Sequence, residues 1–402
     1  MKKKIVIDMA VNLIATAIPI FVLQLIILPR IALYMPDDSY GFLVTVLAFL
    51  NVVPATAGNV LNNIRLLLNN EYESEGLAGD FNLLVAILST VSAVSTLLFL
   101  LFYDKNPSTK GALLTVLVCV LWLMKEYYIV AFRIIISYRS ILICNLCCVL
   151  GYGIGFLLFR MDGTWQYIYI FGLALSLCYC FKNSPIWKEP FARTKLFQNT
   201  NRQTIMLLTA KLLNRVITYA DKIIIFPFLG GAVVSIYYAA TVFGKVVSLM
   251  ITPINSVALT YLSKLKNRKD SMFSSALLLG TGVCTLGYVF CILVSKPILS
   301  ILYPQYVGEA LKYIKITTAT TVIYALASIV DPFIMKFYDM KWQIIINSST
   351  VAVYLILCLG TMMLYGLAGF CAGALITNVL KLGLMILIYY KGRGIQDSDR
   401  TH

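Results

Sequence analysis

Hydrophobic residues in this chain come in blocks of about 17–25, separated by short polar breaks, and about 20 apolar residues in a helix cross the hydrocarbon core of a bilayer. The expected fold is therefore all-α: a polytopic membrane protein with about twelve transmembrane helices, six in each half of the chain. The pattern predicts spans at about 5–29, 39–63, 81–103, 112–136, 141–159, 166–182, 205–229, 234–262, 271–295, 309–330, 343–365 and 367–390.

The composition agrees with this pattern. Mean hydropathy is +0.84 and 13% of residues are charged, against about 25% in a typical soluble domain. The formal net charge is +15, which basic loops facing anionic lipid explain. Membrane lipid is therefore an expected partner, and nucleic acid is not.

The distribution of Lys and Arg predicts the orientation. One set of breaks holds 19 of these residues, including Lys2–Lys4, the five between 182 and 202, and those of the tail after 390. The opposite set holds five: Arg30, Lys105, Lys110, Arg160 and Lys296. Since basic loops stay in the cytoplasm, both termini of this multi-pass protein are expected there.

The chain also reads as two halves. Pro29, Tyr40 and Pro54 recur as Pro227, Tyr238 and Pro253 at offsets of 198, 198 and 199, as duplicated transporter halves would give. The longest cytoplasmic break mixes basic and aromatic residues, which suits a segment lying on the inner leaflet. The expected domains are an N-terminal bundle (1–182), an interfacial connector (183–204), a C-terminal bundle (205–390) and a tail (391–402).

Five polar or cationic residues form one stripe on the predicted seventh span. At about 100° per residue they share one helix face: Lys211, Asn214, Arg215, Thr218 and Lys222. A cation at bilayer depth costs about 2.5–3.5 kcal/mol on insertion scales. The stripe is therefore expected to face a bundle interior or a water-filled cavity, although Lys211 is also near enough to the inner surface to snorkel.

Other spans carry further charges. Lys125, Glu126 and Arg133 lie in the fourth, Lys245 in the eighth and Lys381 in the twelfth. Glu126 and Arg133 are seven residues apart, so they could form a structural tie or part of a site. Asp221 beside Lys222 could be a buried pair or a helix-end group, and Lys312 and Lys315 suit snorkelling at a span end.

The surplus of intramembrane cations points to an anionic cargo. Cation pumps and drug–proton antiporters need deep carboxylates, whereas Lys as a point charge and Arg as a fork suit phosphate or pyrophosphate. The expected substrate path holds Arg215, Lys222, Lys211, Arg133, Lys381, Lys245 and Lys125. The candidates for ion coupling or pairing are Glu126, Asp221 and Asp8.

No metal site, cofactor or catalytic residue is expected. All ten cysteines lie in predicted spans, and the Cys144-x-x-Cys147 pair has no second pair to complete a metal motif. Small residues suit helix contacts instead, as do Gly151-x-x-x-Gly155 and Gly369-x-x-x-Gly373.

The seventh and eighth spans resemble those of polysaccharide flippases. The resemblance rests on the run Tyr219-Ala-Asp221-Lys222-Ile-Ile-Ile-Phe-Pro-Phe-Leu-Gly-Gly, followed by Tyr237-Tyr238-Ala-Ala, Pro253 and Tyr261-Leu-Ser-Lys264. Ile301-Leu-Tyr-Pro-Gln-Tyr306 is similar to a short outer turn of the same proteins. The chain looks most like O-antigen (Wzx-type) flippases of the multidrug/oligosaccharidyl-lipid/polysaccharide exporter superfamily.

The resemblance implies a non-enzymatic transporter of the bacterial cytoplasmic (inner) membrane, with two six-helix bundles around a central cleft that opens alternately to each side. Its cargo would be an undecaprenyl-pyrophosphate-linked oligosaccharide, for O-antigen (lipopolysaccharide) or capsule biosynthesis. A polysaccharide polymerase and chain-length proteins are implied as partners. Peptidoglycan-precursor flippases of the superfamily are usually longer, with two additional spans.

Two alternatives stay open. A cation-coupled multidrug antiporter of the same superfamily would need deep acidic residues in the first and seventh spans. A membrane polysaccharide polymerase or acyltransferase would need a larger outer loop, and an enzyme of this kind would lack an intramembrane histidine as its base, because His402 is the only histidine.

Overall fold

The computed structural model describes residues 14–104, 108–242, 244, 270–338 and 340–391. It divides into two compact units, residues 1–234 and 235–402. All regular secondary structure in the described residues is helical. The expected all-α polytopic membrane fold is confirmed, since eight described helices are long and apolar enough to cross a bilayer.

The first unit begins with a helix whose regular hydrogen bonding is interrupted. Residues 14–22 are α-helical, Leu23–Ile27 form a π-helical turn, and α2 (Leu28–Ala32) continues from it. Next come α3 (Asp37–Val52) and α4 (Pro54–Ser74), which form one long span bent at Pro54. Proline bends the span because its ring removes an N–H donor and displaces a carbonyl of the preceding turn.

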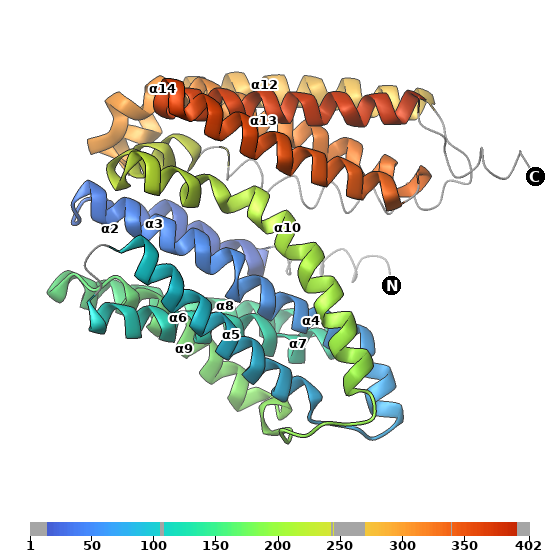
Figure 1. Cartoon of the computed structure of the whole chain (residues 1–402). Helices are drawn as coiled ribbons and strands as arrows, with labels where there is room; N and C mark the ends of the chain where they lie inside the picture. The colour runs from blue at the N-terminus through green and yellow to red at the C-terminus, as the bar shows by residue number, and fades with distance from the viewer. Residues whose placement is uncertain (1–13, 105–107, 243, 245–269, 339, 392–402) are drawn as a thin grey trace, which may run out of the picture. The chain divides into compact units, whose positions relative to one another are not determined.

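Five further helices of the first unit follow before the connector to α10 (Figure 1). They are α5 (Asp80–Tyr103), α6 (Thr109–Tyr128), α7 (Val130–Ile134), α8 (Tyr138–Asp162) and α9 (Gln166–Asn183). The α8–α9 hairpin packs tightly because Gly151 and Gly155 have no side chain. A Cβ on Gly151 would lie 2.3 Å from the Phe171 carbonyl oxygen, and one on Gly155 would lie 2.4 Å from the Tyr167 carbonyl oxygen.

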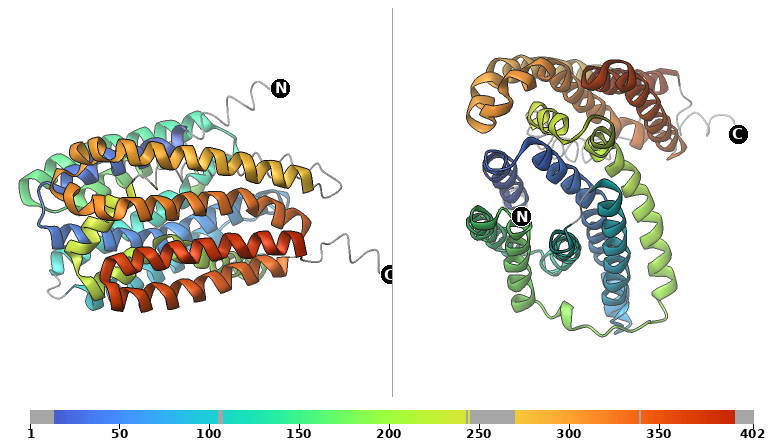
Figure 2. Two further views of the ribbon diagram at one scale, coloured as in Figure 1. Left: turned by 90° about the horizontal axis from the view of Figure 1, so that it is seen from above. Right: turned by 60° about the vertical axis from the view of Figure 1, so that its left-hand side comes forward.

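A connector leads from α9 to α10 (Phe197–Leu229), past the end of α4 (Figure 2, right). It contains the short turn η2 (Ile186–Lys188). By its contacts α10 belongs to the first unit, where it packs against α3, α4 and α5. The assignment of the predicted seventh span to a separate C-terminal bundle stays a prediction.

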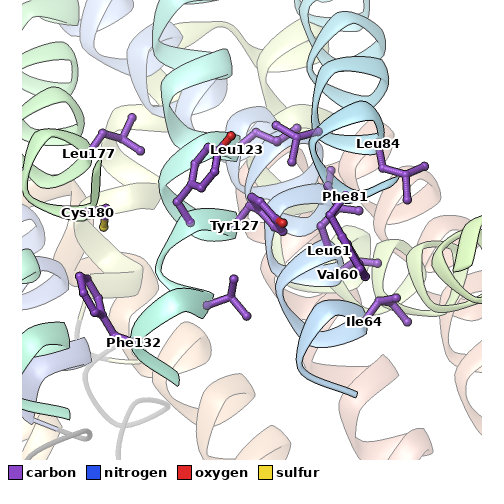
Figure 3. Packing of buried hydrophobic residues seen from close by; sticks show 14 of the residues in the cluster. Val60, Leu61, Ile64, Phe81, Leu84, Leu123, Tyr127, Phe132, Leu177 and Cys180 are labelled. Atoms are coloured by element: carbon purple, nitrogen blue, oxygen red, sulfur yellow. The ribbon is translucent and has the colours of Figure 1, made fainter. Parts of the chain in front are cut away.

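The buried core of the first unit lies among α4, α5, α6 and α9 (Figure 3). Val60, Leu61 and Ile64 of α4 face Phe81 of α5 and Tyr127 of α6, and all five side chains are almost fully buried. The apolar residues of α4 therefore occupy one face of the helix, which leaves its asparagines on another.

Among the described residues, the second unit has three long helical segments besides the end of the apolar helix Gly231–Val242. They are α12 (Asp270–Leu302), α13 (Val307–Phe337) and α14 (Met340–Lys391), with the turn η3 (Pro304–Tyr306) between the first two. Helix α13 packs against both α12 and α14. Phe273 of α12 stacks on Tyr389 of α14 with ring centroids 3.6 Å apart.

Most predicted spans coincide with helices, and several helices continue beyond the apolar block. Helix α4 extends to Ser74, α10 begins at Phe197 and α13 ends at Phe337. The predicted eleventh and twelfth spans both lie in α14, which Gly366 breaks with a φ of 59°, a backbone region that glycine adopts readily. The eighth span lies outside the described residues beyond position 244.

Candidate functional site

Two polar helix faces meet in the first unit. On α4, Asn59, Asn62 and Asn63 have the i, i+3, i+4 spacing of one face. On α10, Lys211 and Arg215 are one turn apart, and both side chains are half-buried. Helix α10 packs against α4, so the asparagine face and the cations come together.

Hydrogen bonds to amide oxygens hold two of the cations. Lys211 Nζ donates to Asn59 Oδ1 at 2.7 Å. Arg133 of α7 donates from Nη1 to Asn62 Oδ1 and, at 3.2 Å, to Asn63 Oδ1. The third cation, Arg215, has its guanidinium carbon 5.9 Å from the Tyr219 ring centroid. Here Arg133, Lys211 and Arg215 with the three asparagines are called the cation cluster.

The end of α6 helps to build the cluster. Helix α6 stops at Tyr128 and α7 begins at Val130, and the last carbonyls of a helix lack helical partners. Asn62 Nδ2 donates to two of them, Glu126 O at 2.9 Å and Tyr127 O at 3.4 Å. One asparagine therefore satisfies the helix end and presents its oxygen to Arg133.

No carboxylate in the described part of the chain forms an ion pair with the cations of the cluster. Lys211 lies within electrostatic range of both Arg133 and Arg215. Amide oxygens orient a cation without neutralising it. Three half-buried like charges, two of them oriented by amide oxygens, form a site suited to an anion with several oxygens.

Other expected path cations have carboxylate partners. Lys125 Nζ lies 3.1 Å from Glu126 Oε1. Lys222, which is 3% exposed, forms an ion pair with the neighbouring Asp221. The suggested tie between Glu126 and Arg133 is absent from the described contacts, because the break between α6 and α7 interrupts the helical register that would have aligned the two side chains.

Lys381 belongs to the second unit. It is 9% exposed on α14, and its ammonium lies 5.4 Å from the ring centroid of Tyr324 on α13. Asp331 of α13 lies within electrostatic range of Lys381 and beside Gln343. Lys381 thus has an acidic neighbour that the sequence reading missed, because it ended the tenth span at residue 330.

Not every expected site residue can be placed. Lys245 and Asp8 lie outside the described residues, and so does the side chain of Asn214. Thr218 is exposed on α10. The asparagines of α4 were missed as site residues, although their spacing within an apolar span is a signal that the sequence contains.

Comparison with known proteins identifies the fold. No family model and no curated protein matches the sequence. Three solved structures are similar over nearly the whole chain, at sequence identities that establish the fold alone. The first is a multidrug resistance MATE family transporter of the MOP superfamily in its inward-facing conformation, with a TM-score of 0.70 and 8% identity over 94% of this chain and 97% of the other.

The second is the lipid II flippase MurJ in its inward closed conformation, with a TM-score of 0.72 and 15% identity over 97% of this chain and 88% of that one. The third is the Vibrio cholerae MATE transporter VcmN in its bent form, with a TM-score of 0.56 and 13% identity over 95% and 94%. This chain therefore has the fold that multidrug transporters and a lipid II flippase share.

Proposed function

We propose that this protein is a transporter of the multidrug/oligosaccharidyl-lipid/polysaccharide exporter superfamily that flips undecaprenyl-pyrophosphate-linked oligosaccharide from the inner to the outer leaflet. The observation that carries the proposal is the cation cluster: asparagine oxygens hold Arg133 and Lys211, Arg215 lies one turn along α10 from Lys211, and none of the three has a carboxylate partner among the described residues. The proposed product is the precursor of O-antigen or capsule at the bacterial inner membrane.

The cluster would replace the water around the pyrophosphate. An isolated ion cannot cross hydrocarbon without a large penalty, whereas the polyprenyl tail can stay in lipid throughout. Arg133 and Arg215 offer planar pairs of donors to phosphate oxygens, and Lys211 adds a point charge. Alternating access then moves the headgroup while the tail follows along the bilayer. The MurJ structure supports this reading, since that protein flips lipid II.

A cation-coupled multidrug antiporter is the second candidate. The MATE transporters of the same fold favour it, and so does Asp331, a carboxylate inside α13 beside Lys381. This candidate requires an acidic group to attract the cationic drug or to carry the coupling ion. Glu126 and Asp221 are weaker candidates for that role, because each already pairs with a neighbouring lysine.

Deleting the gene and measuring lipid-linked oligosaccharide on the inner leaflet tests the proposal. We expect the oligosaccharide to accumulate in the deletion strain. The wild-type gene should remove the accumulation, and the Arg215→Ala variant, expressed at the wild-type level, should not. Arg202→Ala is the matched control, because Arg202 is an exposed arginine of the same helix. Unchanged lipid-linked sugar together with new sensitivity to cationic drugs would contradict the flippase and support the antiporter.

A further inference from the structure

The connector between α9 and α10, residues 184–196, has its polar and aromatic residues on unexpected sides. A loop in water normally exposes its carboxylates and buries its aromatic rings. Here the aromatic and basic side chains point outward and the carboxylate points inward. We infer that this connector is a docking surface for the anionic headgroups of phospholipids.

An ion pair holds the connector against the first unit. Glu189 accepts two hydrogen bonds from Arg65 of α4, at 2.7 and 3.0 Å, and the two side chains are 15% and 8% exposed. The Arg65 guanidinium also lies 4.7 Å from the Phe81 ring centroid. The carboxylate is therefore neutralised beneath the connector and contributes nothing to its outer surface.

Two side chains at the start of α5 hold the connector at further points. Asp80 accepts hydrogen bonds from the Thr194 amide at 2.7 Å and from the Thr194 hydroxyl. Asn82 donates to the carbonyl oxygen of Glu189 at 2.9 Å and to that of Ile186 at 3.3 Å. These bonds are spread along the connector, so they fix which of its side chains face outward.

That outward face combines aromatic rings with cations. Trp187 is 41% and Phe191 68% exposed, and Trp187 donates from its indole nitrogen to the Phe181 carbonyl oxygen at 2.9 Å. Lys188 and Arg193 are exposed, and the Lys188 ammonium lies 5.4 Å from the Trp187 ring centroid. Trp187 therefore lies beside the Lys188 ammonium, and Phe191 is two residues from Arg193 in the sequence.

The exposed charges that the connector itself carries have one sign. Glu189 is the only acidic residue between positions 182 and 202, and it is turned inward to Arg65. The outward cations are Lys182, Lys188, Arg193 and Lys195, of which Lys195 pairs with Glu75 at 3.2 Å. A surface of this charge complements phosphodiester headgroups, and each Lys or Arg near an anionic membrane adds to the attraction.

The place of the connector in the chain fits the same occupant. It begins where α9 ends, one residue beyond the predicted sixth span, so its first residues lie at the level where that span leaves the hydrocarbon. Trp and Tyr rings are enriched at this level, and basic residues beside apolar rings are typical of segments that lie in the interface. The inference concerns lipid contact alone and does not depend on the proposed cargo.

Quenching of Trp187 by brominated lipid tests the inference. The chain has four tryptophans, so Trp122→Phe, Trp165→Phe and Trp342→Phe in the full-length protein leave Trp187 as the only one. The protein is placed in nanodiscs of phosphatidylcholine and phosphatidylglycerol, with bromine on only one of the two lipids. We expect brominated phosphatidylglycerol to quench about twofold more at equal fraction, with a smaller difference at about 0.5 M salt.

Two charge-matched variants complete the experiment. Lys188→Gln with Arg193→Gln should abolish the lipid preference and leave quenching equal for both lipids. Lys110→Gln with Arg160→Gln should retain it, because these residues lie at the other end of the α8–α9 hairpin. If the triple tryptophan variant does not fold, the difference between the wild-type chain and Trp187→Phe measures the same quenching. Equal quenching by both lipids in the unmutated connector, or none by either, would overturn the inference.

Discussion

At the scale of single residues, the intramembrane cations differ in the groups that hold them. Lys125 and Lys222 pair with neighbouring carboxylates, whereas Lys211 and Arg133 are held by asparagine oxygens. A neutral acceptor fixes the position of a cation and leaves its charge available. The number of cations in a span is therefore a poorer guide to an anion site than the chemistry of their partners.

The pair of Arg65 and Glu189 leads to a prediction about stability. Removing one partner of a buried ion pair leaves the other charge unbalanced, at a cost of about 3–5 kcal/mol. We expect Glu189→Gln and Arg65→Met each to lower the free energy of unfolding by about 3 kcal/mol, seen as a lower melting temperature of the purified protein in detergent.

The double variant Arg65→Met with Glu189→Leu should be more stable than either single variant, because no buried charge remains. Lys110→Ala serves as a control, since the pair of Lys110 with Asp162 is exposed and should not change the melting temperature measurably. Additive losses in the double variant would contradict this account of the connector.

At the scale of helices, glycines decide how closely two spans approach. Gly151 and Gly155 of α8 face the backbone of α9, whereas Gly153 of the same helix has nothing within 4 Å of where a Cβ would lie. The Gly-x-x-x-Gly spacing suggested a helix contact from the sequence. The structure identifies α9 as the partner and separates the packed glycines from the open one.

These three glycines give a matched comparison. Gly151→Ala and Gly155→Ala should destabilise the protein, because each methyl group would overlap the α9 backbone, and overpacking costs about 1–3 kcal/mol. Gly153→Ala should be neutral or raise the stability by up to about 1 kcal/mol, since alanine favours a helix over glycine. Thermal unfolding of the three variants measures the difference, and equal melting temperatures would refute the close contact.

At the scale of the whole molecule, the distribution of Lys and Arg predicts the topology. The 19 basic residues on one side and five on the other predict that the connector and both termini lie in the cytoplasm. A fluorescent protein fused after His402 should therefore fluoresce, and alkaline phosphatase at the same position should be inactive. A single cysteine at Gly163, in a background without the ten native cysteines, should react with an impermeant thiol reagent from outside. The opposite pattern at both positions would reverse the topology.

The sequence predicts the bounds of the membrane spans better than it predicts the residues of the candidate site. The helices Asp80–Tyr103 and Gln166–Asn183 begin and end within one residue of their predicted spans. In these two helices the apolar block that crosses the bilayer and the helix have the same length. The continuation of α4 to Ser74 was missed, because its last turns pack against protein groups and need no apolar block.

The sequence by itself determined that this is an all-helical membrane protein, and that its spans carry more cations than carboxylates, because both follow from residue type and spacing. Only the tertiary structure decided which cations keep an unbalanced charge. Asn59, Asn62 and Asn63 meet Arg133 and Lys211 across α4, α7 and α10, between positions 70, 71 and 152 residues apart in the chain, and no local pattern encodes such a meeting. Hydrogen-bond partners depend on packing, and packing brings together residues that are distant in the chain.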